Sequence, residues 1–343
     1  GTKCFISAGD HDLTPNIVHP VLARIEGDPP GTKGISIFIV PKIRVNDDGS
    51  LGEPNDVKTG GIEHKMGIKG SATATLNFGE DGNCIGELLG NEREGIKIMF
   101  MMMNEARLGT GMQGLVLSLA ALEHAVAYAK ERIQGTAIWE MKNPEAKPVA
   151  IINHPDVRRK LLWIKSHVEG SRSLCYFTAF CIDMAKVAKT EEEKVKWEGL
   201  LDLMTPVLKA WTTDKGLLSC SMAMDVYGGY GYCSEYPAEQ YLRDEKIAQI
   251  YEGTNGIQAL DLVGRKVVGS GGAFYKHFAE EIKAFTDSAD ASLAEFVNPL
   301  KDAIANLELM TADLLERAKA NPNEVGAASV EYLQVFGYTA YAY

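Results

Sequence analysis

The chain has 343 residues, which is enough for two or three domains that each bury a core. Its 35 Lys and Arg against 46 Asp and Glu leave a formal net charge of −11, the wrong sign for a surface that binds nucleic-acid phosphates. The longest apolar runs fall short of the ~18 residues expected of a membrane span. Composition therefore predicts a globular protein with no nucleic-acid partner and no membrane span.

The six cysteines and seven histidines are scattered along the chain. None of them forms a CxxC pair, an HExxH motif or another spacing typical of metal ligands. Most of the cysteines stand in apolar segments, which is typical of buried thiols that stay reduced. The pattern predicts a reducing compartment and no protein-bound metal.

Residues 1–90 are predicted to form an antiparallel β domain. Short runs rich in β-branched residues occur at 4–6, 17–25, 35–40 and 73–78. Turn-forming clusters separate them, including residues 46–49 and the pair Gly60-Gly61.

Residues 91–268 are predicted to form an antiparallel bundle of the four-helix type. From about residue 92, apolar residues recur every three or four positions, as the buried stripe of a long helix requires. Further helices are expected at 155–189, 190–226, 237–247 and 256–268. The third long helix begins with Thr190 as its cap and Glu193 in the capping-box position, and Pro206 is expected to bend it.

Residues 269–343 are predicted to form an appended helical domain. The run Gly269-Ser270-Gly271-Gly272 has the composition of a flexible linker. Amphipathic patterns follow at 273–287, 291–319 and 324–343. The whole pattern predicts an α+β fold that is mainly α.

A glycine-rich turn stands out between two of the predicted helices. Gly228, Gly229 and Gly231 follow a helix rather than a strand, so they do not form a Rossmann fingerprint. Glycines allow backbone amides to approach an anion or a pyrophosphate closely. The alternative is a helix C-cap followed by a tight turn.

Glu252 stands at a break between two helical segments, with Ile250 and Ile257 nearby. A carboxylate among apolar residues suits a general base that takes a proton from weakly acidic carbon. Gly253 leaves room beside it for a substrate. The alternative is a solvated loop carboxylate or a helix cap.

Several segments resemble motifs of the acyl-CoA dehydrogenase family and follow one another along the chain in the family's order. Residues 227–253 carry an aromatic-Gly-Gly-x-Gly-aromatic turn, a Glu-Tyr-Pro, an Arg-Asp and an Ile-Tyr-Glu-Gly at the family's spacing. Residues 4–9 resemble its flavin-side strand, 65–71 its Lys-Met-Gly turn, 104–107 its arginine-bearing helix and 131–135 its Glu-Arg-x-Gln segment. The extension past Gly269, together with residues 6–12, resembles the larger bacterial branch that includes 3-(methylthio)propanoyl-CoA dehydrogenase.

The resemblance implies an FAD-dependent acyl-CoA dehydrogenase. In it, Glu252 removes the α-proton of an acyl-CoA thioester, its backbone amide polarises the thioester carbonyl, and the β-hydrogen leaves as hydride to flavin N5. The family pattern places substrate-binding residues at Asn104, Arg107, Tyr251 and Gly253. It places FAD-binding residues at Phe5, Ile6, Ser7, Arg132, Gln134, Asp225, Gly228, Gly229, Thr254 and Asn255.

The resemblance also implies partners and a setting. A homodimer or a dimer of dimers is expected if Arg132 and the glycine turn hold FAD across a subunit interface. An electron-transfer flavoprotein is the expected electron acceptor, in fatty-acid β-oxidation in the bacterial cytoplasm or in a mitochondrial matrix. The alternatives are an acyl-CoA oxidase that uses oxygen, and a non-catalytic flavoprotein or DNA-protective protein on the same fold.

Three departures from the family pattern limit these expectations. Asp225 stands where Gln is usual, and a carboxylate near a pyrophosphate is unfavourable unless it turns to a ribose hydroxyl or an amide. Gly256 stands where another Gln is common, which removes one expected adenosine contact. The family's N-terminal helical domain and first strands have no counterpart before Gly1, so we expect an incomplete β domain and an acyl pocket that lacks one wall.

Overall fold

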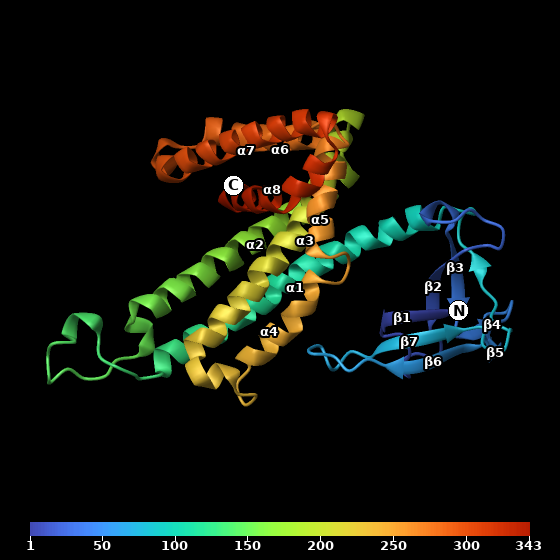
Figure 1. Cartoon of the computed structure of the whole chain (residues 1–343), viewed down its shortest axis with the longest axis horizontal. Helices are drawn as coiled ribbons and strands as arrows, with labels where there is room; N and C mark the ends of the chain where they lie inside the picture. Colours follow the sequence, from blue (N-terminus) through green and yellow to red (C-terminus); the bar gives the residue numbers. More distant parts are fainter. The chain divides into compact units, whose positions relative to one another are not determined.

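The computed structural model describes residues 1–343, which form two compact units, Gly1–Glu105 and Ala106–Tyr343. The first unit holds all the strands and the beginning of the first long helix, and the second is helical (Figure 1). The predicted fold class, α+β and mainly α with antiparallel sheets at the start of the chain, is confirmed.

Three small antiparallel sheets make up most of the first unit. Their strand orders are β1-β7-β6, β2-β3-β8 and β4-β5. The strands are β1 (Thr2–Ser7), β2 (Val18–Ala23), β3 (Ser36–Pro41), β4 (Ile43–Val45), β5 (Leu51–Pro54), β6 (Val57–Ile62), β7 (Thr73–Phe78) and β8 (Glu87–Leu88). The four runs predicted from the sequence coincide with β1, β2, β3 and β7.

Two strands of the first sheet carry an irregularity. The pair Gly60-Gly61, predicted to form a turn, lies inside β6 instead, where the register with β7 shifts between Thr59 and Gly61. A second shift, between Lys3 and Ile6 of β1, places Phe5 at φ 59° with 71% of its surface exposed. Because bulges re-aim side chains, Phe5 points away from the interior of its own unit.

Three long helices form the core of the second unit: α1 (Gly95–Glu131), α2 (Pro155–Val187) and α3 (Glu191–Tyr227). The predicted cap of α3 is confirmed, since Thr190 Oγ1 accepts a hydrogen bond from the Glu193 N–H at 3.1 Å. Helix α1 approaches α3 closely, because a Cβ on Gly114 would lie 2.6 Å from the Thr212 carbonyl oxygen. The buried side chains of α3, among them Leu203, Leu208 and Trp211, fill the space between the helices.

Two shorter helices follow the glycine-rich turn. Helix α4 (Ala238–Lys246) leads into a 3₁₀ turn at Ile247–Gln249, and α5 (Asn255–Leu260) continues as a π-helical stretch, Asp261–Val268. Both helices pack on α3. This packing places the bend that contains Glu252 against the side of α3.

The last three helices are α6 (Ala273–Ser288), α7 (Ala294–Ala320) and α8 (Asn323–Ala342). The predicted flexible linker before them is an ordered turn, in which the Gly272 N–H donates to the Val267 carbonyl oxygen at 2.8 Å. Helix α8 packs directly on the bundle, since a Cβ on Gly337 would lie 2.3 Å from the Trp211 ring. The three helices therefore share one core with α1–α5, while the domain boundaries drawn from sequence near residues 90 and 269 stay predictions.

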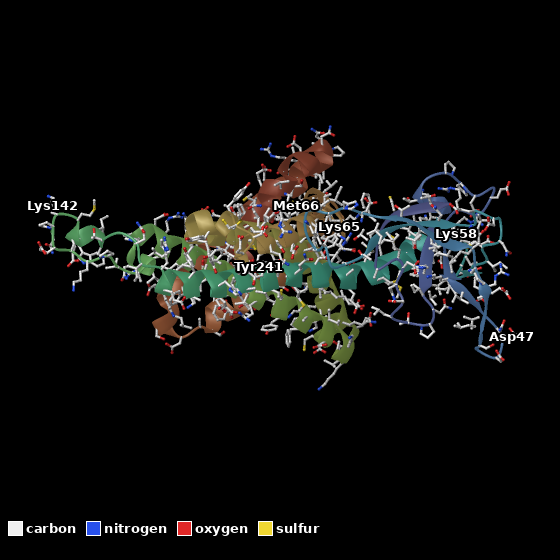
Figure 2. All side chains as sticks on the ribbon, turned by 90° about the horizontal axis from the view of Figure 1, so that it is seen from below. Asp47, Lys58, Lys65, Met66, Lys142 and Tyr241 are labelled. Atoms are coloured by element: carbon white, nitrogen blue, oxygen red, sulfur yellow. The ribbon has the colours of Figure 1, made fainter.

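Helix α1 is long and apolar enough to cross a membrane by length and composition alone. Core helices of soluble proteins pass the same test, and from Ala106 onward α1 contributes buried residues such as Leu115 and Ala125 to the helical core. The segment between α1 and α2 extends beyond the ends of both helices, with Lys142 at its tip (Figure 2).

Candidate active site

Glu252 lies in the bend between the 3₁₀ turn Ile247–Gln249 and α5. Its backbone has φ 57°, a left-handed conformation that is uncommon for any residue but glycine, and Gly253 follows at φ 88°. A Cβ on Gly253 would lie 2.5 Å from Gln258 Nε2, so both the backbone conformation and the available space require glycine there. Two consecutive left-handed residues present the Glu252 side chain at this bend.

The bend that carries Glu252 lies next to Arg107. Glu252 Oε2 is buried and has no hydrogen-bond partner within the chain. The Arg107 side chain is also buried, with Nη2 3.8 Å from the position that a Cβ on Gly253 would take. Arg107 Nη1 lies 3.6 Å from Asp261 Oδ2, so the carboxylate of Asp261 orients the guanidinium. Two of the predicted residues, Glu252 and Arg107, are thus brought together.

Lys209 of α3 supports the bend that contains Glu252. The sequence analysis did not identify this residue. Its side chain is fully buried, and Nζ donates to the Gly253 carbonyl oxygen at 2.6 Å and to Asn255 Oδ1 at 2.9 Å. Burial lowers the pKa of Lys209 to about 8. The signal in the sequence is a lysine between Leu208 and Ala210 on an apolar helix stripe.

Glu245 of α4 is a second buried charge-bearing residue that sequence reasoning missed. Its side chain is fully buried, and neither carboxyl oxygen has a hydrogen-bond partner within the chain. Burial raises the pKa of Glu245 to about 9, so the carboxyl is protonated at neutral pH. Lys209 and Asp214 both act on it electrostatically.

The polar side chains of Tyr251 and Asn255 turn into the protein. The Tyr251 hydroxyl donates to Gln113 Oε1 of α1, and burial raises the pKa of the phenol. The Asn255 amide nitrogen lies 2.7 Å from Asp214 Oδ1, and its oxygen accepts from Lys209. A cofactor contact from the Asn255 side chain would have to replace these bonds. Thr254 Oγ1 caps α5 by accepting from the Ile257 N–H at 3.3 Å.

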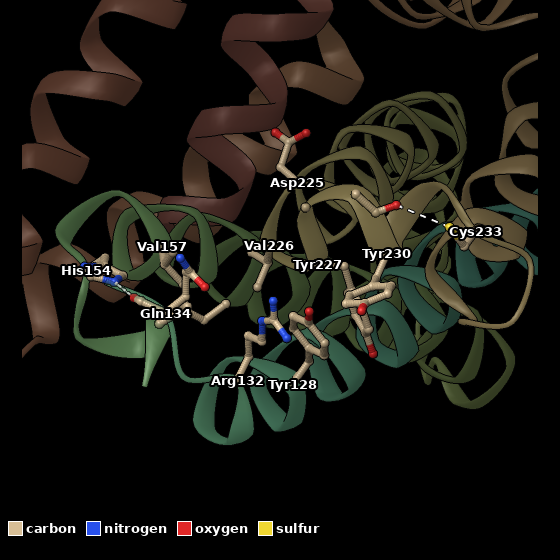
Figure 3. A pocket seen from close by; sticks show the side chains of 13 residues that line it. Tyr128, Arg132, Gln134, His154, Val157, Asp225, Val226, Tyr227, Tyr230 and Cys233 are labelled. Carbon is tan, nitrogen blue, oxygen red and sulfur yellow. Dashed lines mark hydrogen bonds between the residues drawn. The ribbon is translucent and has the colours of Figure 1, made fainter. Parts of the chain in front are cut away.

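A second group of predicted residues lines a pocket of about 610 Å³. Arg132 and Gln134 follow the end of α1, while Asp225, Gly228 and Gly229 come from the end of α3 and the turn after it (Figure 3). The remaining walls are aromatic or apolar and include Tyr128, Val157, Val226, Tyr227 and Tyr230. Five residues predicted to bind FAD are therefore brought together at one concave site.

The chemistry of this pocket suits a phosphate group next to a ring. The Arg132 guanidinium lies 5.5 Å from the centre of the Tyr230 ring, and the side chain is exposed to the pocket. Nothing lies within 4 Å of the position of a Cβ on Gly229, so its backbone is open to a ligand. Asp225 is the carboxylate that the family pattern predicted near a pyrophosphate. Its Oδ2 lies 3.4 Å from Lys160 Nζ, and the lysine offsets its negative charge.

Four predicted residues belong to the first unit. Phe5, Ile6 and Ser7 lie on β1, with Phe5 and Ser7 exposed, and Asn104 is exposed on the part of α1 that belongs to this unit. Their roles stay predictions.

Two family models match the chain. One, described as the C-terminal domain of acyl-CoA dehydrogenase, matches residues 93–267, just over half of the chain. The chain belongs to the acyl-CoA dehydrogenase family. A second model, described as acetyl-CoA dehydrogenase C-terminal like, matches residues 278–343 of this acyl-CoA dehydrogenase family member. The predicted resemblance is confirmed.

Individual acyl-CoA dehydrogenases agree with this assignment. Butyryl-CoA dehydrogenase of Syntrophomonas wolfei is 45% identical over 290 residues, which cover 83% of this chain and 47% of the relative. 3-Methylmercaptopropionyl-CoA dehydrogenase of Ruegeria pomeroyi is 36% identical over 340 residues, which cover 98% of this chain and 57% of the relative. The chain thus spans about half the length of the curated relatives it matches.

A solved structure shows the same fold. The acyl-CoA dehydrogenase of Bacillus anthracis, complexed with FAD, has a TM-score of 0.74 and 22% sequence identity, with 99% of this chain and 55% of that chain covered.

Proposed function

We propose that this protein catalyses the FAD-dependent α,β-dehydrogenation of an acyl-CoA thioester, with Glu252 as the base that takes the α-proton. One observation carries the proposal. In a chain of this family, a buried carboxylate oxygen without a partner stands on a left-handed bend beside a buried arginine. A carboxylate with a free lone pair at a bend, next to Gly253, can accept a proton from a bound substrate.

The residues present fit an FAD dinucleotide. The pocket of about 610 Å³ combines the Arg132 guanidinium, the open backbone at Gly229 and the aromatic rings of Tyr128 and Tyr230. Guanidinium groups and glycine backbones suit a pyrophosphate, and aromatic rings suit a flat base. The relative solved with FAD has the same fold. A bound FAD supplies the acceptor for the electrons of the β-hydrogen.

The chain's own residues have the following parts in the proposed reaction. Glu252 Oε2 accepts the α-proton, and the Glu252 backbone N–H donates to the thioester carbonyl oxygen, which makes that proton more acidic. Gly253 lets the chain turn beside Gln258, where any larger residue would collide. The Arg107 guanidinium, which Asp261 Oδ2 contacts at 3.6 Å, adds a positive charge beside the bend that carries the base.

The relatives indicate a substrate class and a setting for the proposal. Their names point to butyryl-CoA and 3-methylmercaptopropionyl-CoA, so short acyl-CoA thioesters are the first substrates to test. We further propose an electron-transfer flavoprotein as the acceptor and, since both relatives are bacterial, the cytoplasm as the location.

Glu252→Gln tests the proposal in the full-length protein loaded with FAD. Anaerobic addition of butyryl-CoA should bleach the flavin absorbance of the wild type. We expect the variant to bleach about 10²–10⁴-fold more slowly, because an amide cannot take the α-proton. Glu295→Gln, on the exposed surface of α7, is the matched control and should behave like the wild type.

A Glu252→Gln variant that retains its flavin and bleaches at the wild-type rate would contradict the role of the base. A wild-type protein that binds FAD but is bleached by neither butyryl-CoA nor 3-methylmercaptopropionyl-CoA would contradict the substrate class. The hydrogen peroxide yield per turnover in air separates a dehydrogenase, for which little peroxide is expected, from an oxidase.

A further inference from the structure

We propose that Lys209 is a positioning residue that holds the base loop, residues 251–255, in the conformation that aims Glu252 at its substrate. This inference rests on the proposed function of Glu252. It concerns a residue of a different element, since Lys209 lies in the middle of α3 and the base loop precedes α5.

Two consecutive carbonyl groups of the base loop are each held by a buried side chain. Lys209 Nζ donates to the Gly253 oxygen at 2.6 Å, and Gln258 Nε2 donates to the Glu252 oxygen at 3.2 Å. Both donors are fully buried. The two residues whose carbonyls they hold are the two with left-handed φ, at 57° and 88°.

The conformation at Glu252 needs such support. A non-glycine residue in the left-handed region is strained and persists only where its surroundings enforce it. Lys209 stabilises this left-handed conformation, because the same ammonium group also binds Asn255 Oδ1 and so connects the bend to the first turn of α5. Loss of this group leaves the bend free to relax toward ordinary φ values.

The burial of Lys209 also calls for a role. A buried ammonium group is costly, and the hydrogen-bond acceptors of Lys209 are the neutral oxygens of Gly253 and Asn255. The ionisable groups that face it are Asp214 of α3, Glu252, Arg107 of α1 and Glu245 of α4. Hydrophobic residues of the same volume would fill this space at lower cost. Both hydrogen bonds of the buried ammonium group nevertheless go to the base loop.

Lys215 provides a matched control on the same helix. It is the other buried lysine of α3, 6% exposed. Its Nζ lies 3.3 Å from the Tyr338 hydroxyl and 4.0 Å from the centre of the Trp211 ring, so it contacts α8 and not the base loop. A general effect of removing a buried lysine from α3 should show in Lys215→Met as well as in Lys209→Met.

The first test measures the loop itself, without substrate. Amide hydrogen exchange is recorded on the full-length protein with FAD, for wild type, Lys209→Met and Lys215→Met. We expect amides 252–255 to exchange at least about 10-fold faster in Lys209→Met than in wild type, and to change less than about 2-fold in Lys215→Met. Equal changes in the two variants, or unchanged exchange in Lys209→Met, would overturn the proposal.

The second test asks whether Lys209 acts through Glu252. With saturating butyryl-CoA, flavin bleaching should be about 10–100-fold slower in Lys209→Met, while the half-saturating concentration changes less than about 3-fold. In a Glu252→Gln background the same substitution should slow bleaching less than about 2-fold, because the base it positions is gone. An equal loss in both backgrounds would overturn the positioning role. If no acyl-CoA bleaches the wild type, the proposed function fails, and hydrogen exchange still decides whether Lys209 holds the loop.

Discussion

At the scale of single residues, Glu245 is the group whose ionisation should most affect stability. Its pKa is raised by burial to about 9 in the folded protein, against an ordinary value of 4.5. Between these two values the folded chain keeps a proton that the unfolded chain has lost. The free energy of unfolding therefore falls as pH rises from about 5 to 9.

Glu245→Gln should remove this pH dependence. At pH 5 the variant and the wild type should unfold at similar temperatures, because both side chains are neutral. Between pH 5 and pH 8 the wild type should lose up to about 4 kcal/mol relative to the variant, since each pH unit between the two pKa values corresponds to about 1.4 kcal/mol, and its melting temperature should fall by several degrees relative to the variant. Thermal unfolding followed by circular dichroism at pH 5, 6.5 and 8 measures the difference.

The same experiment distinguishes the contribution of Glu245 to the pH dependence of stability from that of Lys209. The pKa of Lys209 is lowered to about 8 from 10.5, so its own contribution changes only above pH 8, where stability should rise with pH. Glu295→Gln on exposed α7 should follow the wild type at every pH. A Glu245→Gln variant whose stability relative to wild type is the same at pH 5 and pH 8 would show that Glu245 ionises normally.

Only part of the site could be predicted residue by residue. Glu252 could be found because the residues around it form one contiguous motif, and Arg107 because it belongs to a second motif. Lys209 and Glu245 reach the site through packing between helices, and in sequence each is only a charged residue within a helical pattern. The inward turn of Asn255 is set by Asp214, a partner that no local pattern reveals.

At the scale of elements, the turn after α3 contains glycines with different roles. Gly229 has an open space where a Cβ would be, and its backbone faces the pocket of Arg132. At Gly231 a Cβ would lie 2.3 Å from the Met224 carbonyl oxygen, which is backbone and cannot move aside. The first glycine leaves room for a ligand, and the second allows the turn to pack on α3.

Substitutions at these two glycines should therefore affect different properties, FAD binding at Gly229 and stability at Gly231. Gly229→Ala should keep the melting temperature of the protein without FAD and raise the dissociation constant for FAD by about 10-fold, equal to about 1.4 kcal/mol, because the methyl group enters the pocket. Gly231→Ala should lower the melting temperature of the same form by several degrees. Flavin fluorescence titration and thermal unfolding measure the two effects. Equal loss of stability in both variants would contradict the division of roles.

The elements themselves were predictable where one residue pattern dominates. The long helices follow from apolar spacing sustained over many turns, and β7 follows from a short run in which Thr73, Thr75 and Phe78 favour strands. Strand β6 was hidden because Gly60 and Gly61, which usually mark turns, form a bulge paired with β7. The turn at 269–272 looked like a linker because its order comes from hydrogen bonds back to Gly264 and Val267.

At the scale of the whole molecule, α1 separates the two groups of site residues. Arg107 lies near the start of the part of α1 that belongs to the helical unit, and Arg132 directly follows the end of α1, 25 residues later. At about 1.5 Å per residue this separation is about 37 Å. Because Glu252 lies near Arg107, we predict that the Glu252 and Arg132 of one copy serve different FAD molecules. A second copy of the chain would then supply one of the two residues to each site.

Mixed dimers test this arrangement. Glu252→Gln and Arg132→Ala chains with different tags are co-expressed, and dimers with both tags are purified. If each site combines Glu252 of one copy with Arg132 of the other, a mixed dimer has one site with both substitutions and one intact site. We therefore expect about half of the wild-type flavin bleaching by butyryl-CoA per mixed dimer, although each variant alone bleaches poorly.

The result depends on which copy supplies each residue to a site, and not on how far either substitution alone slows bleaching. If both residues served the FAD of their own copy, every site in the mixed dimer would carry one defect, and bleaching would stay as poor as in the separate variants. A control pair of Glu252→Gln and Lys209→Met chains should not complement, because these residues lie at one bend of the same copy and each site would keep one defect. Recovery in the first pair together with none in the second would place the two halves of the site on different copies.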